Sequence, residues 1–311
     1  MWTSKVSRFL QVAILIVATV HLTGMVLVKF GKFHIHPVDT QVDNSSAIHR
    51  LPECIVIGVR KGGTRALLDM INLHSQVKIA KAEVHFFDIE TNFHLGLEWY
   101  KSQMPKTMPG ELAIEKSPSY FVTESVPQRI FAMNPQILLL LVLRDPVTRL
   151  ISDYTQIMYN HLERGRTFKS FEELVFFPNK SVNTGYEAVA KSIYVQYIHR
   201  WMHFFPKNQI HIVNGDRLIH QPWHELRKVE QFLGLPLQIE KNDFFFNSTK
   251  GFHCLKKKTS SNPELHCLTK SKGRAHPNIT DETKTRLRKF YAQFNYDLYN
   301  VVDRDFGWPE E

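Results

Sequence analysis

The sequence has few acidic runs or repeats, no low-complexity tract and no recognisable spacing of metal ligands. His199 and His203 lie four residues apart, as on one face of a helix, but the glutamate of an HExxH motif is missing. We interpret these histidines as packing or surface residues and predict no metal site. The stretch of about 260 residues behind the N-terminal region suits one large α/β domain.

A Walker A motif is also absent. The stretch Cys54–Arg65, CIVIGVRKGGTR, is typical of a buried strand that feeds a glycine loop and then a helix. Backbone N–H groups and the helix dipole meet there, which predicts a cradle for phosphate or sulfate. Lys61 precedes the glycines and Thr64 follows them, whereas in a Walker A loop lysine directly precedes the hydroxyl residue. The later strand 137–143 runs into Arg144 instead of a magnesium-binding aspartate, so a magnesium-dependent NTPase is disfavoured. An ordinary turn with glycines at positive φ is the other alternative.

Charged residues are missing from the N-terminal span 9–28, which is long enough to cross a bilayer. Basic residues precede it, which favours a short cytoplasmic tail at 1–8 and a lumenal remainder. A cleaved signal peptide is the alternative, but no clear A-x-A site follows, so we expect an uncleaved signal-anchor. The polar residues 29–52 are interpreted as a stem, and 53–311 as the lumenal domain.

Sequons and cysteines support a secretory compartment. Four N-x-[ST] triplets, each a weak signal, are candidate glycosylation sites at Asn44, Asn179, Asn247 and Asn278. In an oxidising lumen, the natural pair among the three cysteines is Cys254 with Cys267, and this small loop contributes about 3 kcal/mol. Cys54 lies in the apolar strand and is expected to be a buried packing residue.

Strand and helix patterns alternate along the domain, which predicts an α/β fold with a mostly parallel central sheet flanked by helices. Strands are expected at 54–59, 77–80, 111–115, 137–143 and 209–213. Helices are expected at 65–70, 126–133, 146–161, 186–205 and 223–233. The run 137–143 is apolar throughout, as in a strand covered on both faces. A ligand is expected at the carboxyl ends of these strands.

Polar residues follow the expected second and third strands. Glu83 and His85 stand two apart, so an extended backbone places both on one face, with Val84 and Phe86 on the other. In this apolar segment the proton affinity of the carboxylate can rise toward that of a general base. The alternative is a surface pair. Lys116 supplies a cation at the same rim.

The fourth strand is followed by residues that suit a second phosphate. Arg144 leaves the strand, and Arg149, Ser152 and Gln156 are spaced to share one side of the next helix. A formal net charge of +9 is consistent with an anionic partner, although a solvated surface can also carry it. The run 256–258 is either a contact for a polyanion such as heparin or a solvated hairpin tip. Nucleic acid is a poorer partner for a lumenal chain.

Six segments together resemble one family. VRKGGTRALL, EVHFFD, IEKSPSYF, LRDPVTRLISDYTQ, GDRLI and SKGRAHP occur in this order between Cys54 and Trp308. They are similar to segments of the heparan sulfate glucosamine 3-O-sulfotransferases, most of all the isoform 1 type. The resemblance implies a sulfotransferase fold related to the P-loop nucleotide kinases. It also implies 3′-phosphoadenylyl sulfate (PAPS) as donor, transfer to the 3-hydroxyl of glucosamine in heparan sulfate, and a place at the Golgi membrane, facing the lumen.

The resemblance also implies roles for residues. The loop around the 5′-phosphosulfate would be Lys61, Gly62, Gly63, Thr64 and Arg65. Arg144 and Ser152 would hold the 3′-phosphate, and the segment that closes over the nucleotide would be Lys272, Gly273, Arg274, Ala275 and His276. His253 stands where the family usually has a tyrosine that contacts the donor.

For the acceptor side, the resemblance implies that Glu83 is the general base, positioned by His85 and Asp88. Acceptor contacts would be Arg60, Lys116 and Gln156. Sulfuryl transfer is an in-line displacement, so Glu83 would take the hydroxyl proton while Lys61 and the loop amides stabilise the leaving phosphate. A sulfuryl group carries less charge than a phosphoryl group, so no metal is required. The alternatives are a kinase or NTPase and a heparan-sulfate-binding protein without catalysis.

Overall fold

The computed structural model describes residues 46–257, 264–268 and 274–311. The predicted tail at 1–8, the anchor at 9–28, most of the stem, Asn44, Lys272 and Gly273 lie outside these residues, as does the tip of the basic run 256–258. Within the described residues, no helix combines the length and the apolar character that a membrane crossing needs.

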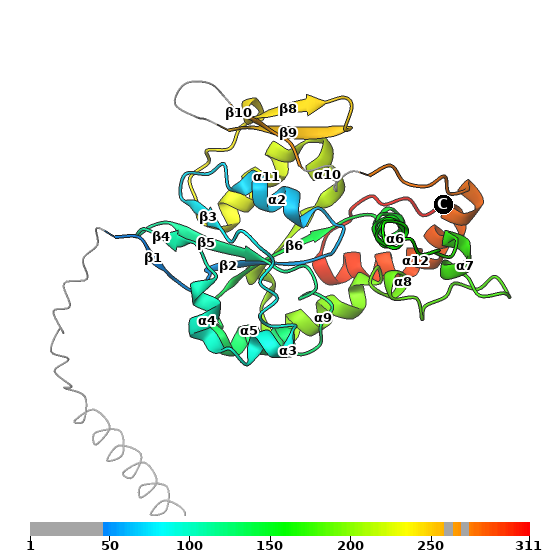
Figure 1. Ribbon diagram of the computed structural model, residues 1–311, viewed down its shortest axis with the longest axis horizontal. Coiled ribbons are helices and arrows are strands. Elements are labelled where there is room, and N and C mark those ends of the chain that lie inside the picture. Colours follow the sequence, from blue (N-terminus) through cyan, green and yellow to red (C-terminus); the bar gives the residue numbers. More distant parts are fainter. Residues whose placement is uncertain (1–45, 258–263, 269–273) are drawn as a thin grey trace, which may run out of the picture. The chain divides into compact units, whose positions relative to one another are not determined.

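The core of the domain is a sheet of five parallel strands (Figure 1). In spatial order these are β3 (Val77–Ile79), β5 (Leu112–Lys116), β2 (Cys54–Gly58), β6 (Leu138–Leu143) and β7 (Ile210–Asn214). Every neighbouring pair is parallel. The predicted α/β class and the five predicted strands are confirmed, with strand ends shifted by at most one residue.

Side chains alternate between the two faces of this sheet, and each face is covered by helices. Ile55 and Leu139 belong to one core, and Val56 and Leu140 to the other. The second core includes α2 (Thr64–Ile71), α10 (Gly215–His220) and α11 (Pro222–Phe232). The first includes α4 (Gly96–Ser102), α5 (Val126–Met133), α6 (Pro146–Leu162), α9 (Tyr194–Phe204) and α12 (Asp281–Val302). Figure 1 shows α2, α10 and α11 on one side of the sheet and α4, α5 and α9 on the other.

The helix after β6 begins as its sequence predicts. Asp145 caps α6 by accepting a 2.8 Å hydrogen bond from the backbone N–H of Thr148, and Pro146 is its first residue. The predicted helix 186–205 is wrong in one respect, because it is divided into α8 (Glu187–Ala190) and α9. Between them Ser192 is buried against α6, where its hydroxyl donates to the carbonyl of Pro146.

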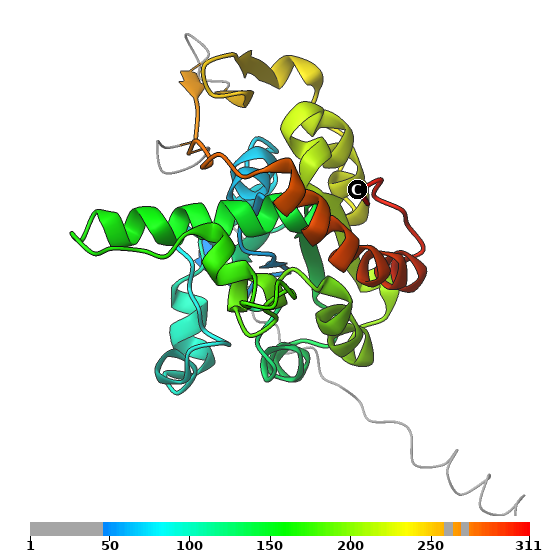
Figure 2. The same cartoon turned by 90° about the vertical axis from the view of Figure 1, so that its right-hand side faces the viewer.

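Several elements were not predicted. A second sheet is antiparallel, with β8 (Phe244–Asn247), β9 (Phe252–Lys257) and β10 (Glu264–His266) in the order β10-β9-β8. The predicted disulfide between Cys254 and Cys267 is present in it. The long helix α12 packs against α6 and α9 (Figure 2). Shorter helices are α3 (Glu90–Phe93) and α7 (Phe171–Val175), and 3₁₀ turns span Lys207–Gln209 and Lys241–Asp243.

The end of the predicted stem belongs to the folded domain. β1 (Ile48–His49) pairs antiparallel with β4 (Lys106–Thr107). The Nδ1 atom of His49 lies 2.6 Å from the carbonyl oxygen of Met104. These contacts place the start of the domain a few residues before position 53.

The three described sequon asparagines differ in their surroundings. Asn179 and Asn278 are exposed. Asn247 is partly buried, and its Oδ1 atom accepts the backbone N–H of Lys250. Glycosylation at these positions stays a prediction.

Candidate active site

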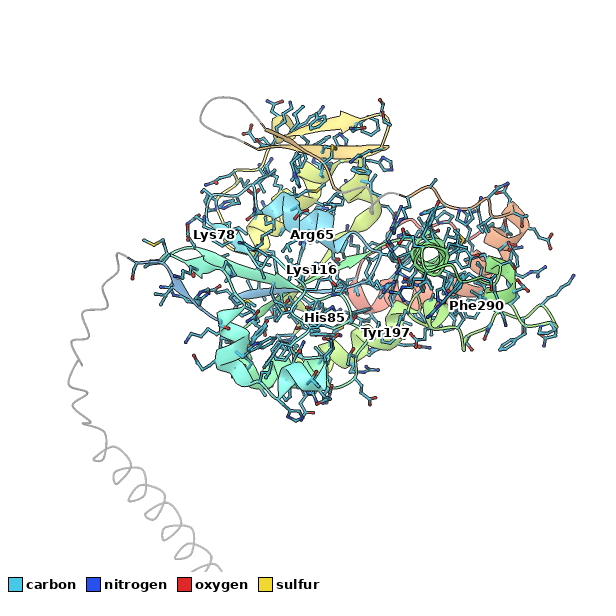
Figure 3. The ribbon with its side chains drawn as sticks, in the orientation of Figure 1. Arg65, Lys78, His85, Lys116, Tyr197 and Phe290 are labelled. Carbon is cyan, nitrogen blue, oxygen red and sulfur yellow. A yellow bond between two sulfur atoms is a disulfide. The ribbon has the colours of Figure 1, made fainter. Side chains whose placement is uncertain are left out.

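A cavity of about 820 Å³ lies at the carboxyl ends of β2, β5 and β6. It brings together most of the predicted site residues: Arg60, Lys61, Gly62, Gly63, Thr64, Arg65, Glu83, His85, Lys116, Arg144, Ser152, Gln156, His253, Arg274 and His276. Figure 3 shows three of them, Arg65, His85 and Lys116, at the middle of the domain. Asp88 lies behind His85, and Ala275 is exposed and does not line the cavity.

The glycine loop fits tightly between β2 and α2. Gly63 precedes α2 with φ of 113°, so one glycine does supply positive φ, and Lys61 has φ of 69°. A Cβ atom on Gly62 would lie 2.5 Å from the carbonyl oxygen of Val142, so only glycine fits against β6 there. The first N–H groups of α2 have no partner within the helix and border the cavity. This arrangement suits an anion such as phosphate or sulfate.

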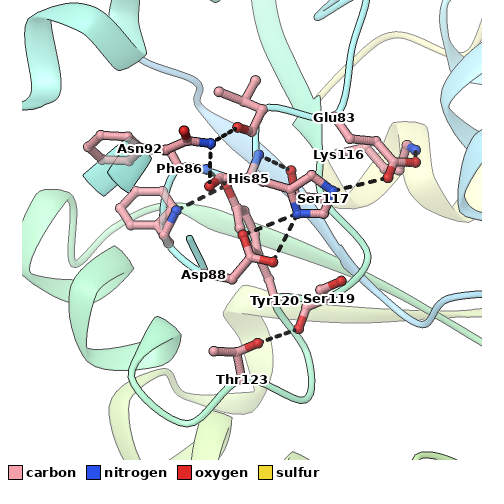
Figure 4. A network of polar contacts seen from close by, with 12 residues as sticks. Glu83, His85, Phe86, Asp88, Asn92, Lys116, Ser117, Ser119, Tyr120 and Thr123 are labelled. Atoms are coloured by element: carbon pink, nitrogen blue, oxygen red, sulfur yellow. Dashed lines mark hydrogen bonds and ion pairs between the residues drawn. The ribbon is translucent and has the colours of Figure 1, made fainter. Parts of the chain in front are cut away.

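The loop after β3 and the end of β5 meet at Glu83 (Figure 4). The ammonium group of Lys116 pairs with Oε1 of Glu83, and Nε2 of His85 lies 3.3 Å from Oε2. On its other side, His85 Nδ1 lies 2.9 Å from Asp88. Glu83 and Lys61 line the same cavity, so the carboxylate is not remote from the loop.

The charges around Glu83 correct one expectation. Its pKa is lowered from 4.5 to about 2, chiefly by the hydrogen bond from His85 and, against the effect of burial, also by Lys116. Sequence reasoning predicted a raised value, because the neighbouring Val and Phe side chains indicated an apolar setting. Two cationic partners outweigh this partial burial. The pKa of His85 is raised to about 10, first by Asp88 and then by Glu83.

A second group of cations lies at the end of β6. Nε of Arg144 donates to Oδ1 of Asp216 at 3.0 Å. The pKa of His276 is lowered by partial burial and then by Arg144 and Lys61, so positive charge is concentrated here. The guanidinium of Arg274 lies over the ring of Tyr159, 5.3 Å from its centroid.

His253 belongs to an aromatic part of the wall. Its Nδ1 atom lies 3.1 Å from the carbonyl oxygen of Ile219. The imidazole also makes edge contacts with the rings of Trp223 and Phe246, at 5.4 and 5.3 Å between centroids. An imidazole therefore occupies the wall position expected for a tyrosine.

The expected common face of Arg149, Ser152 and Gln156 is wrong for Arg149. Ser152 and Gln156 line the cavity, but Arg149 is fully buried and donates to Ser192 and Asp153. Arg149 and Gln156 point in nearly the same direction, but Arg149 lies about two turns nearer the start of α6, where Ser192 and Asp153 accept its guanidinium. Asp153 also accepts a 2.8 Å hydrogen bond from Nε of Arg60, and Nη1 of Arg149 donates to the backbone carbonyl of Arg60 at 3.3 Å, so Arg149 holds Arg60 both directly and through Asp153.

Sequence reasoning missed the wall formed by α10 and the start of β9. Its members are Gly215, Leu218, Ile219, His220, Lys250, Gly251 and Phe252. A signal was present, because 214–215 follow the last predicted parallel strand and therefore lie at the same edge of the sheet. In the three described ranges, no group of three His, Cys, Asp or Glu side chains could hold a metal ion. His199 and His203 are both exposed on α9, which confirms them as surface residues.

Comparison with known proteins identifies the family. A family model described as sulfotransferase domain matches residues 51–299. Mouse heparan sulfate glucosamine 3-O-sulfotransferase 5 is 48% identical over 270 residues, which cover 86% of this chain and 77% of the relative. The mouse 3B1 enzyme is 47% identical over 262 residues, covering 83% and 65%. A sulfotransferase structure from Alicyclobacillus acidocaldarius shares the fold, with a TM-score of 0.59, 18% identity and coverage of 82% and 96%.

The expected likeness to isoform 1 is corrected by these relatives, which support an isoform 5-like sequence. The family itself is shown by the identity and by the length of chain matched. This chain belongs to the heparan sulfate glucosamine 3-O-sulfotransferase family.

Proposed function

We propose that this protein transfers a sulfuryl group from PAPS to the 3-hydroxyl of glucosamine units in heparan sulfate. One observation carries the proposal: the Glu83 carboxylate, held by Lys116 and His85, lines the same cavity as the loop of Lys61, Gly62 and Gly63. A proton acceptor and an anion cradle thus face one space, as an in-line transfer requires.

In this mechanism Glu83 accepts the proton of the sugar hydroxyl as the oxygen forms its bond to sulfur. The bond between sulfur and the phosphate oxygen breaks, and the nucleotide leaves as adenosine 3′,5′-bisphosphate. Lys61 and the amides at the start of α2 stabilise the negative charge that develops on this phosphate. Residues of the chain supply every charge in this scheme, and the proposal includes no metal.

The low pKa of Glu83 means that the carboxylate is ionised and ready, but a weak base while both cations hold it. Lys116 links the proton affinity of Glu83 to the binding of the acceptor. When a sulfate or carboxylate of the polysaccharide takes the ammonium group, Glu83 loses a partner and its proton affinity rises. Acceptor binding therefore strengthens the base that will deprotonate the acceptor.

The donor site fits a nucleotide with two anionic ends. The loop and the group of Arg144, Ser152 and Arg274 line the same cavity, and each would take one of these ends. Among the described residues, the buried Nη1 atom of Arg274 finds no hydrogen-bond partner, which suits a phosphate oxygen. PAPS has both a 5′-phosphosulfate and a 3′-phosphate to meet these groups.

The partner and the compartment complete the proposal. Arg60, Lys116 and Gln156 border the cavity and would contact the polyanion, with affinity that falls as salt is added. The disulfide suits an oxidising compartment. The basic flank and apolar span at 9–28 favour anchoring in the Golgi membrane with the domain in the lumen.

The test is Glu83→Gln, measured with radiolabelled donor and heparan sulfate. We expect transfer to be lost while affinity for adenosine 3′,5′-bisphosphate stays the same. Glu98→Gln, on an exposed part of α4, is the control and should be fully active. Unchanged turnover in Glu83→Gln contradicts the role of the base. Magnesium-dependent ATP turnover in the unaltered protein, or polysaccharide binding without transfer, would replace the proposed function.

A further inference from the structure

A buried carboxylate lies directly behind the proposed base and does not line the cavity. Glu115, in β5, has no exposed surface. Its Oε1 atom accepts from the hydroxyl of Tyr100 at 3.2 Å, and Oε2 accepts from Ser117 at 3.1 Å. A side-chain hydrogen bond from Tyr120 completes a set of three hydroxyl donors around one carboxyl group.

Two of these hydroxyls also accept hydrogen bonds from the backbone just after Glu83, at His85 and Phe86. Ser117 Oγ accepts the N–H of His85 at 3.0 Å, and the Tyr120 hydroxyl accepts the N–H of Phe86 at 2.9 Å (Figure 4). A hydroxyl has one proton, so its lone pairs face the backbone only while that proton points elsewhere. An ionised carboxylate accepts and never donates, so Glu115 fixes both hydroxyls in the required direction.

The held segment has a backbone that needs such support. His85 has φ of 50°, a left-handed conformation that costs a residue with a Cβ atom about 1 kcal/mol or more. From the other side, Asn92 Nδ2 donates to the carbonyl oxygens of Val84 and His85, both at 3.1 Å. This conformation aims the imidazole at Glu83 on one side and Asp88 on the other.

We propose that Glu115 is a positioning residue for the base: acting through Ser117 and Tyr120, it fixes the backbone at His85 and so the imidazole that orients Glu83. This inference rests on the proposed function and deepens it. Glu115 itself touches neither donor nor acceptor, because it is buried and outside the cavity wall.

The ionisation state of Glu115 decides whether it can accept all three hydrogen bonds. Burial raises the pKa of Glu115 to about 7, against the effects of the three hydroxyls and of the nearby His85. The ionisable groups that face it are Tyr100 and Tyr120 besides His85, which is itself bordered by Glu83 and Asp88. A protonated Glu115, or a glutamine in its place, carries a donor, so one of the three hydroxyls must accept from it and no longer has the carboxylate as acceptor for its own proton.

The experiment compares Glu115→Gln with Glu230→Gln. Glu230 is equally buried but binds the backbone N–H groups of Gln238 and Ile239, away from the cavity. For Glu115→Gln we expect kcat to fall about 10- to 100-fold with donor affinity unchanged, because a misplaced base slows transfer without altering the loop. The NMR titration of His85 should also move to lower pH, since a nearby negative charge is lost. Glu230→Gln should change neither kcat nor the titration of His85.

Tyr120→Phe removes one link and keeps Glu115, so it should reproduce the fall in kcat even if Glu115→Gln does not fold. Normal kcat in both variants overturns the inference. So does a loss of donor affinity that parallels the loss of kcat, which would indicate general damage. If the unaltered protein shows no transfer, the proposed function fails, and the His85 titration in Glu115→Gln still decides the positioning role: an unshifted titration refutes it.

Discussion

The guanidinium Nε of Arg144 and the Oδ1 atom of Asp216 are 3.0 Å apart, and Oδ2 of the same carboxylate accepts the backbone N–H of Asp145 at 2.9 Å. Asp216 is itself held at the start of α10, where Asn214 accepts its N–H at 3.0 Å. One carboxylate thus fixes both the arginine at the end of β6 and the turn into α6. The direction of the arginine is set from α10, more than seventy residues along the chain.

Replacing Asp216 with Asn tests this arrangement. The charge of the partner is lost while its size is kept, so Arg144 is held less firmly for the 3′-phosphate. We expect affinity for adenosine 3′,5′-bisphosphate, measured by calorimetry, to fall about tenfold. Asp303→Asn, which removes an exposed ion pair with Lys207, is the control and should bind normally. Equal affinities in the two variants would argue against the role of Asp216.

Gly215→Ala should disturb the donor loop without touching a charged group. A Cβ atom at this position would lie 2.3 Å from the carbonyl oxygen of Gly62 and 2.9 Å from that of Leu143. Backbone must move, so we expect a loss of about 1–3 kcal/mol in stability and weaker donor binding. Gly185→Ala, which meets only a side-chain oxygen at 3.2 Å, should be close to neutral in thermal unfolding. A fully stable Gly215→Ala protein with normal donor affinity would contradict the close approach.

The ion pairs of His85 with Asp88 and Glu83 predict that stability depends on pH. Because its pKa is raised from 6.5 to about 10, the ion pairs of His85 contribute their full stability below about pH 6.5 and lose it as the pH rises through 10. Asp88→Asn removes the main cause of the shift. We expect His85 to titrate at lower pH by NMR and the alkaline loss of activity to move in the same direction. Asp281→Asn, on an exposed turn of α12, should leave both curves in place.

Reduction of the disulfide should destabilise the antiparallel sheet of β8, β9 and β10 beside the cavity. Cys254 and Cys267 join β9 to the segment after β10, and their bond contributes about 3 kcal/mol by restricting the unfolded chain. His253 precedes Cys254 and lines the cavity, so donor binding should weaken together with stability. Dithiothreitol should lower the unfolding temperature of the natural protein and leave a variant with serine at both positions unchanged. An equal response of the two proteins would assign the effect to something other than this bond.

The parallel sheet could be predicted because its strands are short apolar runs between turn residues. α12 was missed although its buried residues Leu287, Tyr291 and Leu298 and the partly buried Phe290 and Phe294 recur at helical spacing. Its start did carry a signal, since Thr280 caps it and accepts from the N–H of Thr283. In the antiparallel sheet, β9 (FHCLKK) and β10 (ELH) mix charged and polar residues with apolar ones, so neither forms an apolar run of the kind that marks the parallel strands.

The candidate site, too, could be predicted from the sequence only in part. The glycine loop and Glu83 could be found from local patterns and a family resemblance. The pKa of Glu83 could not, because Lys116 is 33 residues away in sequence and its contact depends on the pairing of β5 with β3. The outward or inward direction of Arg149 on α6 depends on Ser192 and Asp153, which no helical period specifies.

The position of β2 in the sheet has a consequence for how the chain is made. This strand precedes its neighbours, and its partners β5 and β6 follow it by roughly 60 and 85 residues. Nascent protein therefore displays an unpaired, fully apolar edge for as long as those partners are missing. Chaperone engagement during synthesis should be strongest in that interval, before Leu138–Leu143 emerges.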